Sequence, residues 1–277
     1  MPIRRLCIPR LLDVAKRCLV QRSLRPHQYT LLMAKNLNSA TRLLRILEQA
    51  GSHVDNVQTV DAWAKILGVA IEHPIRRAVA VGELVRAMHQ ELEIAAAGLA
   101  TANFSTSLYE SAFSRIENAI SPMLLPHTWN QVKQYVTPEV LTALAFCTEI
   151  LPDEEAQISA DELASIRQKV QELRTAATEP GTPPRLRLLI QHHVELIERA
   201  LAEYVVVGAK ALREAGRTAL GEMIEAKDEV APAKDSPAVS TLESTWKTVN
   251  NAADLALKGE KLAQLGQRAW EALSGFF

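Results

Sequence analysis

A long run without proline, residues 185–227, constrains the fold of this chain more than any other feature of its sequence. Its apolar positions alternate steps of four and three, the spacing that keeps one face of a helix against a partner helix. These positions are Ile190, Val194, Ile197, Leu201, Tyr204, Gly208, Ala211 and Ala215. A continuous helix over the run would be about 64 Å long at 1.5 Å per residue. The side chains become small at Gly208, so we expect a neighbouring element to come closest there.

The rest of the chain shows the same helical period and no convincing strand. The clearest repeat consists of Ala78, Val81, Val85, Met88, Leu92, Ala95 and Leu99. Capping boxes, in which a serine precedes a glutamate by three residues, predict helix starts at Ser107, Ser159 and Ser240. Hydrophobic residues make up 48% of the chain and aromatic residues only 5%, so the core must be mainly aliphatic, which suits helices. We predict an all-α fold, a multi-helix antiparallel bundle with long heptad-patterned helices and a tethered C-terminal amphipathic helix.

Two proline-containing stretches divide the chain. The first lies between Thr178 and Pro184, and the second is 228–238 with the sequence DEVAPAKDSPA. The predicted parts are an N-terminal helical bundle at 1–178, a long central helix at 185–227 packed on that bundle, a linker at 228–238 and an amphipathic helical tail at 239–277. The tail supplies the candidate partner-binding residues Leu242, Trp246, Val249 and Trp270. Because its acids and bases balance, we expect it to dock in a protein groove, on its own domain or on a partner, with a membrane surface as the alternative.

The charge of the chain is unevenly distributed although the net charge is only −1. Residues 1–47 contain ten basic residues and one acid. The candidate basic patch in this segment consists of Arg4, Arg5, Arg10, Arg17, Arg22, Arg25, Arg42 and Arg45. Such a patch can bind nucleic acid, or it can dock on acidic residues of its own chain, for example 153–155. Aromatic residues are scarce around it, so we expect reversal of Arg42 and Arg45 to alter stability rather than nucleic-acid binding.

The sequence contains no motif of a common catalytic or metal site. Its three cysteines are too scattered for a disulfide framework or a zinc site, which favours a reducing, cytoplasmic location. None of the seven histidines follows an acid by three residues, and no phosphate-binding or nucleophile motif is present. We therefore expect no metal, no cofactor and no small-molecule substrate. We also expect no signal peptide, because charged residues interrupt the apolar stretch near the N-terminus, and no transmembrane helix, because the longest uncharged run, 94–109, is too short.

One short pattern provides the enzymatic alternative. Arg187 is followed after four residues by His192, which resembles the Arg-x4-His motif of the HEPN ribonucleases. The resemblance covers these two residues and implies a helical dimer in which the arginine and the histidine act on RNA. On a straight helix, residues five apart lie about 140° apart and converge poorly.

The sequence as a whole predicts a non-catalytic protein that works through helix–helix contacts, with itself as a homo-oligomer or with a protein partner. Proteins of this appearance include bacterial accessory components of toxin–antitoxin and phage-defence systems. The alternatives are a HEPN-like ribonuclease, a membrane-active effector that uses the tail, and a nucleic-acid-binding protein that uses the basic segment.

Overall fold

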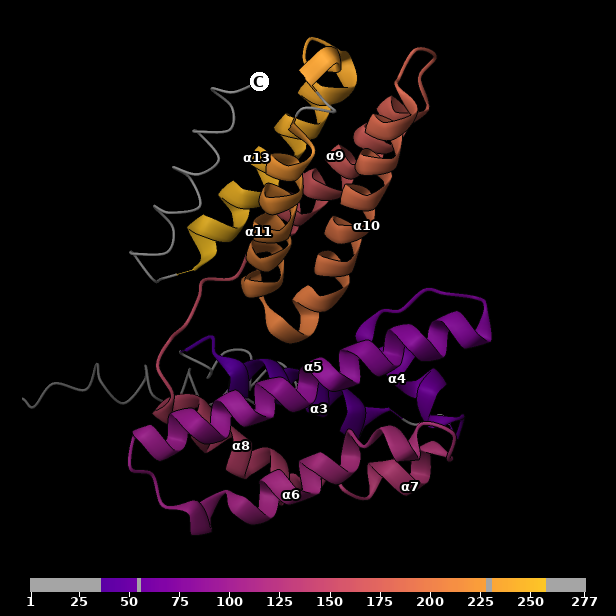
Figure 1. Cartoon of the computed structure of the whole chain (residues 1–277). Coiled ribbons are helices and arrows are strands. Elements are labelled where there is room, and N and C mark those ends of the chain that lie inside the picture. The colour runs from indigo at the N-terminus through magenta and orange to yellow at the C-terminus, as the bar shows by residue number, and fades with distance from the viewer. Residues whose placement is uncertain (1–35, 54–55, 228–230, 258–277) are drawn as a thin grey trace, which may run out of the picture.

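The computed structural model describes residues 36–53, 56–227 and 231–257, which form ten α-helices and no strand (Figure 1). The predicted all-α fold is confirmed. The helices form two lobes that follow one another along the chain, each with its own apolar core. Figure 1 shows the C-terminal lobe standing on one side of the N-terminal lobe. Within the described residues, none of the helices is long and apolar enough to cross a membrane.

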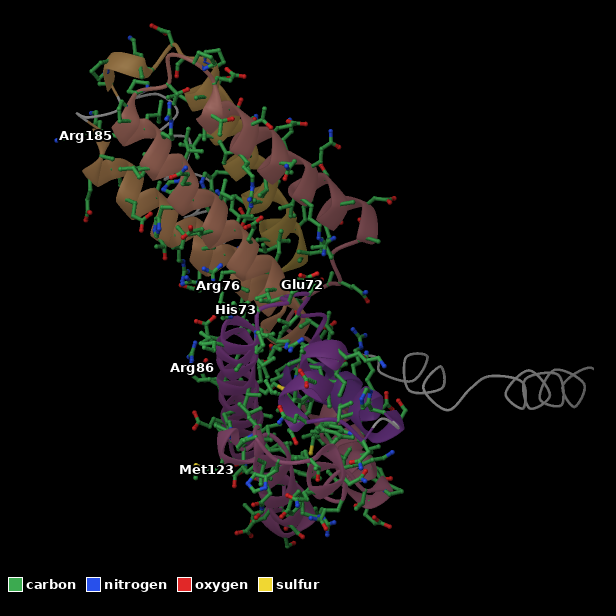
Figure 2. The ribbon with its side chains drawn as sticks, turned by 90° about the vertical axis from the view of Figure 1, so that its right-hand side faces the viewer. Glu72, His73, Arg76, Arg86, Met123 and Arg185 are labelled. Carbon is green, nitrogen blue, oxygen red and sulfur yellow. The ribbon has the colours of Figure 1, made fainter. Side chains whose placement is uncertain are left out.

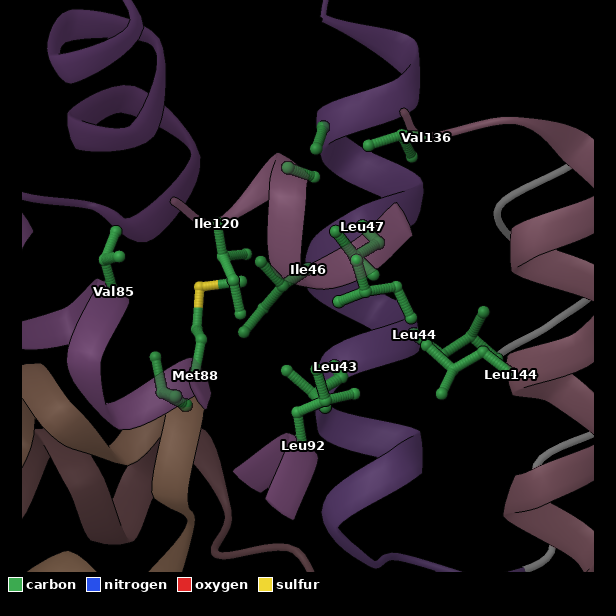
Figure 3. Close-up of a cluster of buried hydrophobic side chains, with 14 of the residues drawn as sticks. Leu43, Leu44, Ile46, Leu47, Val85, Met88, Leu92, Ile120, Val136 and Leu144 are labelled. Atoms are coloured by element: carbon green, nitrogen blue, oxygen red, sulfur yellow. The ribbon is translucent and has the colours of Figure 1, made fainter. Parts of the chain in front are cut away.

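The N-terminal lobe contains six α-helices between residues 36 and 151. They are α3 (Ser39–Ser52), α4 (Thr59–Leu67), α5 (Pro74–Thr101), α6 (Glu110–Ala119), α7 (Trp129–Lys133) and α8 (Pro138–Ile150). Single 3₁₀ turns at Thr106–Leu108 and Pro122–Leu124 connect some of them. Helix α3 is the centre of this lobe, and Figure 3 shows Ile46 on the side of Met88 in α5 and Leu44 on the side of Leu144 in α8.

The start of α3 is fixed by a side chain that serves two helices. The Asn38 side-chain oxygen accepts a hydrogen bond from the backbone N–H of Thr41, which makes it the N-cap. Its amide nitrogen donates to the carbonyl oxygens of Thr148 and Leu151 at the end of α8. These bonds pair backbone groups that both helix ends leave unsatisfied, and they bring the chain after α8 next to the start of α3.

The C-terminal lobe is a four-helix bundle. Its helices are α9 (Ala160–Thr178), α10 (Pro184–Val207), α11 (Ala209–Glu225) and α13 (Pro237–Ala256), and each packs against two others in a closed ring. A 3₁₀ turn at Ala231–Ala233 precedes α13. The predicted capping box at Ser159 starts α9, with Glu162 as its acidic partner. The boundary predicted near residue 178 differs from the observed division, because α9 packs in the second core and not in the first.

The predicted central helix at 185–227 is two helices joined at Gly208. This residue has φ 73° and ψ −154°, a backbone conformation that residues with a side chain avoid. The chain therefore turns back, so that α10 and α11 pack against each other as a hairpin. The apolar row that was predicted along one long helix is therefore divided between α10 and α11, and both parts face the core of the bundle.

Helix α13 completes the bundle and is not a loosely tethered tail within the residues described. Trp246 and Val249 are fully buried and Leu242 is nearly so, all within the core shared with α9, α10 and α11. The tail residues Leu242, Trp246 and Val249 thus pack on the other helices of their own lobe, which was one of the predicted outcomes. Trp270 lies outside the described residues, as do Arg4, Arg5, Arg10, Arg17, Arg22 and Arg25.

Candidate binding groove between the two lobes

The two lobes meet around a buried arginine of α3. Arg42 has only 3% of its side chain exposed, and it forms ion pairs with Glu91 of α5 and with Glu154 and Glu155 of the connecting segment. Its Nη1 donates to Glu155 Oε1 at 2.9 Å, and its Nη2 donates to Glu154 Oε2 at the same distance. Its Nε lies 3.0 Å from Glu91 Oε2. One guanidinium therefore connects two helices of the N-terminal lobe to the segment that leads into the C-terminal lobe.

Two of these glutamates continue into the C-terminal lobe. Glu155 Oε2 accepts a hydrogen bond of 2.7 Å from the backbone N–H of Ala209, at the positively polarised start of α11. Glu154 Oε2 accepts a hydrogen bond of 2.8 Å from Lys210 Nζ. We call Arg42, Glu91, Glu154, Glu155 and Lys210 the junction cluster. Because its members come from both lobes, the cluster fixes how the lobes sit against each other.

Burial and charge act against each other in this cluster. Burial raises the pKa of Glu91 and of Glu155, although Arg42 opposes the rise in both. Glu154 is half buried, which acts to raise its pKa, but its bonds to Lys210 and Arg42 hold that pKa below the ordinary value. For Arg42, burial lowers the pKa, and the three carboxylates more than offset this, so the net direction is upward. The charges of the cluster are thus satisfied inside the molecule, which suits a structural role.

Beside the junction cluster, the two lobes enclose an open groove with a volume of about 760 Å³. Residues 67–71 after α4 and the α5 residues Ala80 and Leu84 line one wall. Residues of α10 between 198 and 205 line the other wall, and Arg167 of α9 contributes at the edge. The volume lies in the range typical of ligand sites, and the lining is mostly apolar.

The apolar surface continues from the groove onto the outer face of α5. Ile71 lies in the groove wall before α5 begins at Pro74, and Ile75 and Val79 follow in the first turns of the helix, four residues apart. Ile75 is 71% exposed and Val79 is 58% exposed, which is unusual for side chains of this kind placed in a row. Figure 2 shows His73 and Arg76, from the same end of α5, where the two lobes meet. We call Ile75 and Val79 the α5 ridge.

The charges in the groove are less completely paired than those of the junction cluster. Glu203 on the α10 wall is half buried and forms no hydrogen bond or ion pair with another residue in the described part of the chain. Burial raises its pKa, while Arg86 and Arg199 at longer range oppose the rise. A half-buried carboxylate without a close partner is a place where a cation from a binding partner would be stabilised.

A second buried polar group lies in the core of the C-terminal bundle. The fully buried His193 of α10 accepts a hydrogen bond of 3.0 Å at Nδ1 from Trp246 Nε1 of α13. Because Nδ1 accepts, the ring proton is on Nε2, which faces Glu222 of α11 at 3.2 Å but without the alignment of a hydrogen bond. Burial, together with the neighbouring His192, lowers the pKa of His193 to about 4. The arrangement ties three helices together around a neutral imidazole.

This histidine predicts a pH dependence of stability. Because its folded-state pKa lies below the ordinary value of 6.5, unfolding takes up a proton, and the stabilisation is lost as the pH falls from about 6.5 to about 4. His193→Gln keeps an acceptor for Trp246 but removes the titrating group. We expect it to reduce the slope of the free energy of unfolding against pH by up to about 1.4 kcal/mol per pH unit. Urea unfolding from pH 4 to pH 7 measures this, with the exposed His127→Gln as the control. Identical slopes for His193→Gln and the wild type would contradict the assignment.

The structure does not bring the two residues of the ribonuclease alternative into contact. Arg187 Nη2 donates to the carbonyl oxygen of Thr182, and His192 Nε2 lies 3.0 Å from Glu222 Oε1. Both side chains thus have other partners, in keeping with the poor convergence expected on a straight helix.

Two arginines of the predicted basic patch lie in the described residues, and neither is a free surface group. Arg42 is the centre of the junction cluster, and its partners Glu154 and Glu155 belong to the acidic stretch considered in the sequence. Arg45 is half buried, and burial lowers its pKa.

Sequence reasoning missed the groove, the ridge and Glu91. A signal for Glu91 was available, because it lies seven residues after the buried Leu84 and so occupies the same face of α5 as that apolar residue. The groove had no local signal, since its walls are far apart in the chain.

Comparison with known protein families, with curated proteins and with solved structures finds no match for this chain.

Proposed function

We propose that this protein is a non-catalytic interaction protein that binds a helix of another polypeptide in the groove between its lobes. The observation that carries this proposal is the continuity of the apolar groove with the exposed α5 ridge. A helix with apolar residues at steps of three and four presents a stripe that matches such a surface. The junction cluster supports the site, because it holds the two walls of the groove at a fixed separation.

The shape of the surface favours a helix over a small molecule. The ridge residues Ile75 and Val79 lie about one helical turn apart on α5, so they extend the apolar surface beyond the groove by about 6 Å at 1.5 Å per residue. A compact ligand would fill the groove and leave Ile75 and Val79 in water. A helix of three or four turns lying along the groove would cover both.

The titratable groups whose pKa is shifted by burial also favour binding over catalysis. Perturbed pKa values mark catalytic candidates when the groups are open to a cleft. The described examples with close partners, Glu155 and His193, are fully enclosed and hydrogen-bonded to other parts of the fold. Their shifts are accounted for by packing between helices.

Photo-crosslinking tests the proposal. We expect the crosslinking residue p-benzoylphenylalanine, introduced at Val79 on the ridge or at Val205 in the groove, to capture a polypeptide in cells that make the protein. Leu188 is the matched control, because it is 65% exposed on α10 but lies outside the groove. Mass spectrometry of the adduct should place the captured position in a helical segment with an apolar stripe. Equal capture at Val79, Val205 and Leu188 would reject the groove as a specific binding site.

A further inference from the structure

We propose that the partner in the groove is a second copy of this chain, whose α5 ridge enters the groove while its own groove receives the ridge of the first copy. This inference rests on the proposed function and names the occupant. It makes the protein a two-fold symmetric dimer with two equivalent apolar contacts.

The relative position of ridge and groove is the first argument. Helix α5 contributes to both, because it presents Ala80 and Leu84 to the groove and exposes Ile75 and Val79 beside it. A convex apolar row beside a concave apolar surface is self-complementary under a two-fold rotation, since each copy offers what the other lacks. One rotation then covers both features at once.

The charges next to these surfaces are the second argument. The carboxylate of Glu203 in the groove lacks a close partner among the described residues, as does the exposed Arg76 one position after the ridge residue Ile75. A ridge that enters a groove brings a basic side chain towards a half-buried acid. Opposite charges placed in this way select the correct partner and its orientation.

The chemistry needed from a partner is therefore present in the chain itself. The occupant must be a helix with apolar residues at steps of four and a basic residue beside them. The start of α5 has this pattern, is exposed, and is held rigidly by the rest of the N-terminal lobe. A rigid helix loses little conformational freedom on binding, which favours association over an equivalent flexible segment.

Sedimentation velocity with light scattering tests this on the full chain. We expect the wild type to have about twice the chain mass of 30.5 kDa at micromolar concentration. The double variant Ile75→Glu and Val79→Glu should raise the dissociation constant at least about tenfold, because it places charges in an apolar contact. Circular dichroism should show an unchanged fold, since both side chains are exposed. Leu188→Glu, the control with similar exposure, should leave the dimer intact.

A charge swap provides the sharper measurement. Arg76→Glu and Glu203→Arg should each weaken the dimer, because each places two like charges at both contacts. The two substitutions combined in one chain should restore much of the affinity, since the pairing is then reversed and not removed. A combined variant weaker than either single variant would overturn the proposed contact.

The remaining outcomes separate this inference from the proposed function. A wild type that remains monomeric at about 100 μM, where weak specific dimers still form, overturns the second copy as occupant. If Val79 and Val205 nevertheless capture a different polypeptide, the proposed function stands and only the identity of the occupant changes. A dimer that Leu188→Glu disrupts as strongly as the ridge variant places the interface elsewhere and also overturns the inference.

Discussion

Replacement of Arg42 by methionine is expected to lower the free energy of unfolding by about 3–5 kcal/mol. The substitution keeps much of the side-chain volume but removes the charge that Glu91 and Glu155 share inside the molecule. Removing one partner of a buried ion pair leaves the other without compensation, which costs far more than an exposed pair. Chemical denaturation at pH 7 measures the loss.

The control for this substitution is Arg217→Met. Arg217 pairs with Glu214 on the surface of α11, where both side chains are at least half exposed, so the expected change is within about 0.5 kcal/mol. A loss below about 1 kcal/mol for Arg42→Met would mean that water replaces the guanidinium, contrary to the buried cluster described.

The loss of stability in Arg42→Met should depend on pH. Burial already raises the pKa of Glu91 and Glu155, and Arg42 opposes that rise. Without Arg42 the folded state binds protons at these carboxyls more readily than the unfolded state does. The deficit of the variant relative to the wild type should therefore shrink as the pH falls from 7 towards 5.

Substitution of Gly208 by alanine is expected to be the second large effect, a loss of about 3–5 kcal/mol. The positive φ of 73° is strained for alanine, which costs about 1–3 kcal/mol. A Cβ atom would in addition overlap with the Glu155 carboxylate, which must then move away from the Ala209 N–H. Losing that charged hydrogen bond costs about 1.5–3 kcal/mol.

Two other glycines serve as controls for Gly208→Ala. Gly82 and Gly221 lie inside α5 and α11, and a Cβ atom at either position meets nothing within 4 Å. Alanine at these positions should stabilise the protein by about 0.5–1 kcal/mol through its higher helix propensity. A loss at Gly208 no larger than about 1 kcal/mol would imply that the α10–α11 turn relaxes freely.

The helical period in the sequence predicted most helices, yet it failed to predict the hairpin at Gly208. The apolar row continues in register through Tyr204, Gly208 and Ala211, so the period itself contains no sign of a break. The three valines before the glycine, 205–207, lower helix propensity and were the available signal. The turn is decided by tertiary packing, because only a hairpin lets α11 and α13 close the bundle.

The junction cluster beside the groove could not be predicted from local sequence patterns, because its members are far apart in the chain. Arg42 and Glu91 are 49 positions apart, and Arg42 and Glu155 are 113 apart. In the sequence each is an ordinary charged residue, and only the tertiary packing of helices and of the connecting segment makes them partners. The α5 ridge is the exception, since Ile75 and Val79 could have been noticed as a second pair of apolar residues beside the buried row.

The order of the lobes along the chain has a consequence for synthesis on the ribosome. The N-terminal lobe has its helices from α3 to α8 within residues 39–150, so those helices can pack while the later residues are still being added. At that stage Arg42 and Glu91 can pair, but Ala209 and Lys210 have not yet been made. The surface of α3 and α5 that packs against α10 stays exposed to solvent until the α10–α11 hairpin has been synthesised. The C-terminal lobe closes last, because α9 must wait for α13. A nascent chain halted before α11 is made would therefore expose Glu154 and Glu155 without their partners Lys210 and Ala209.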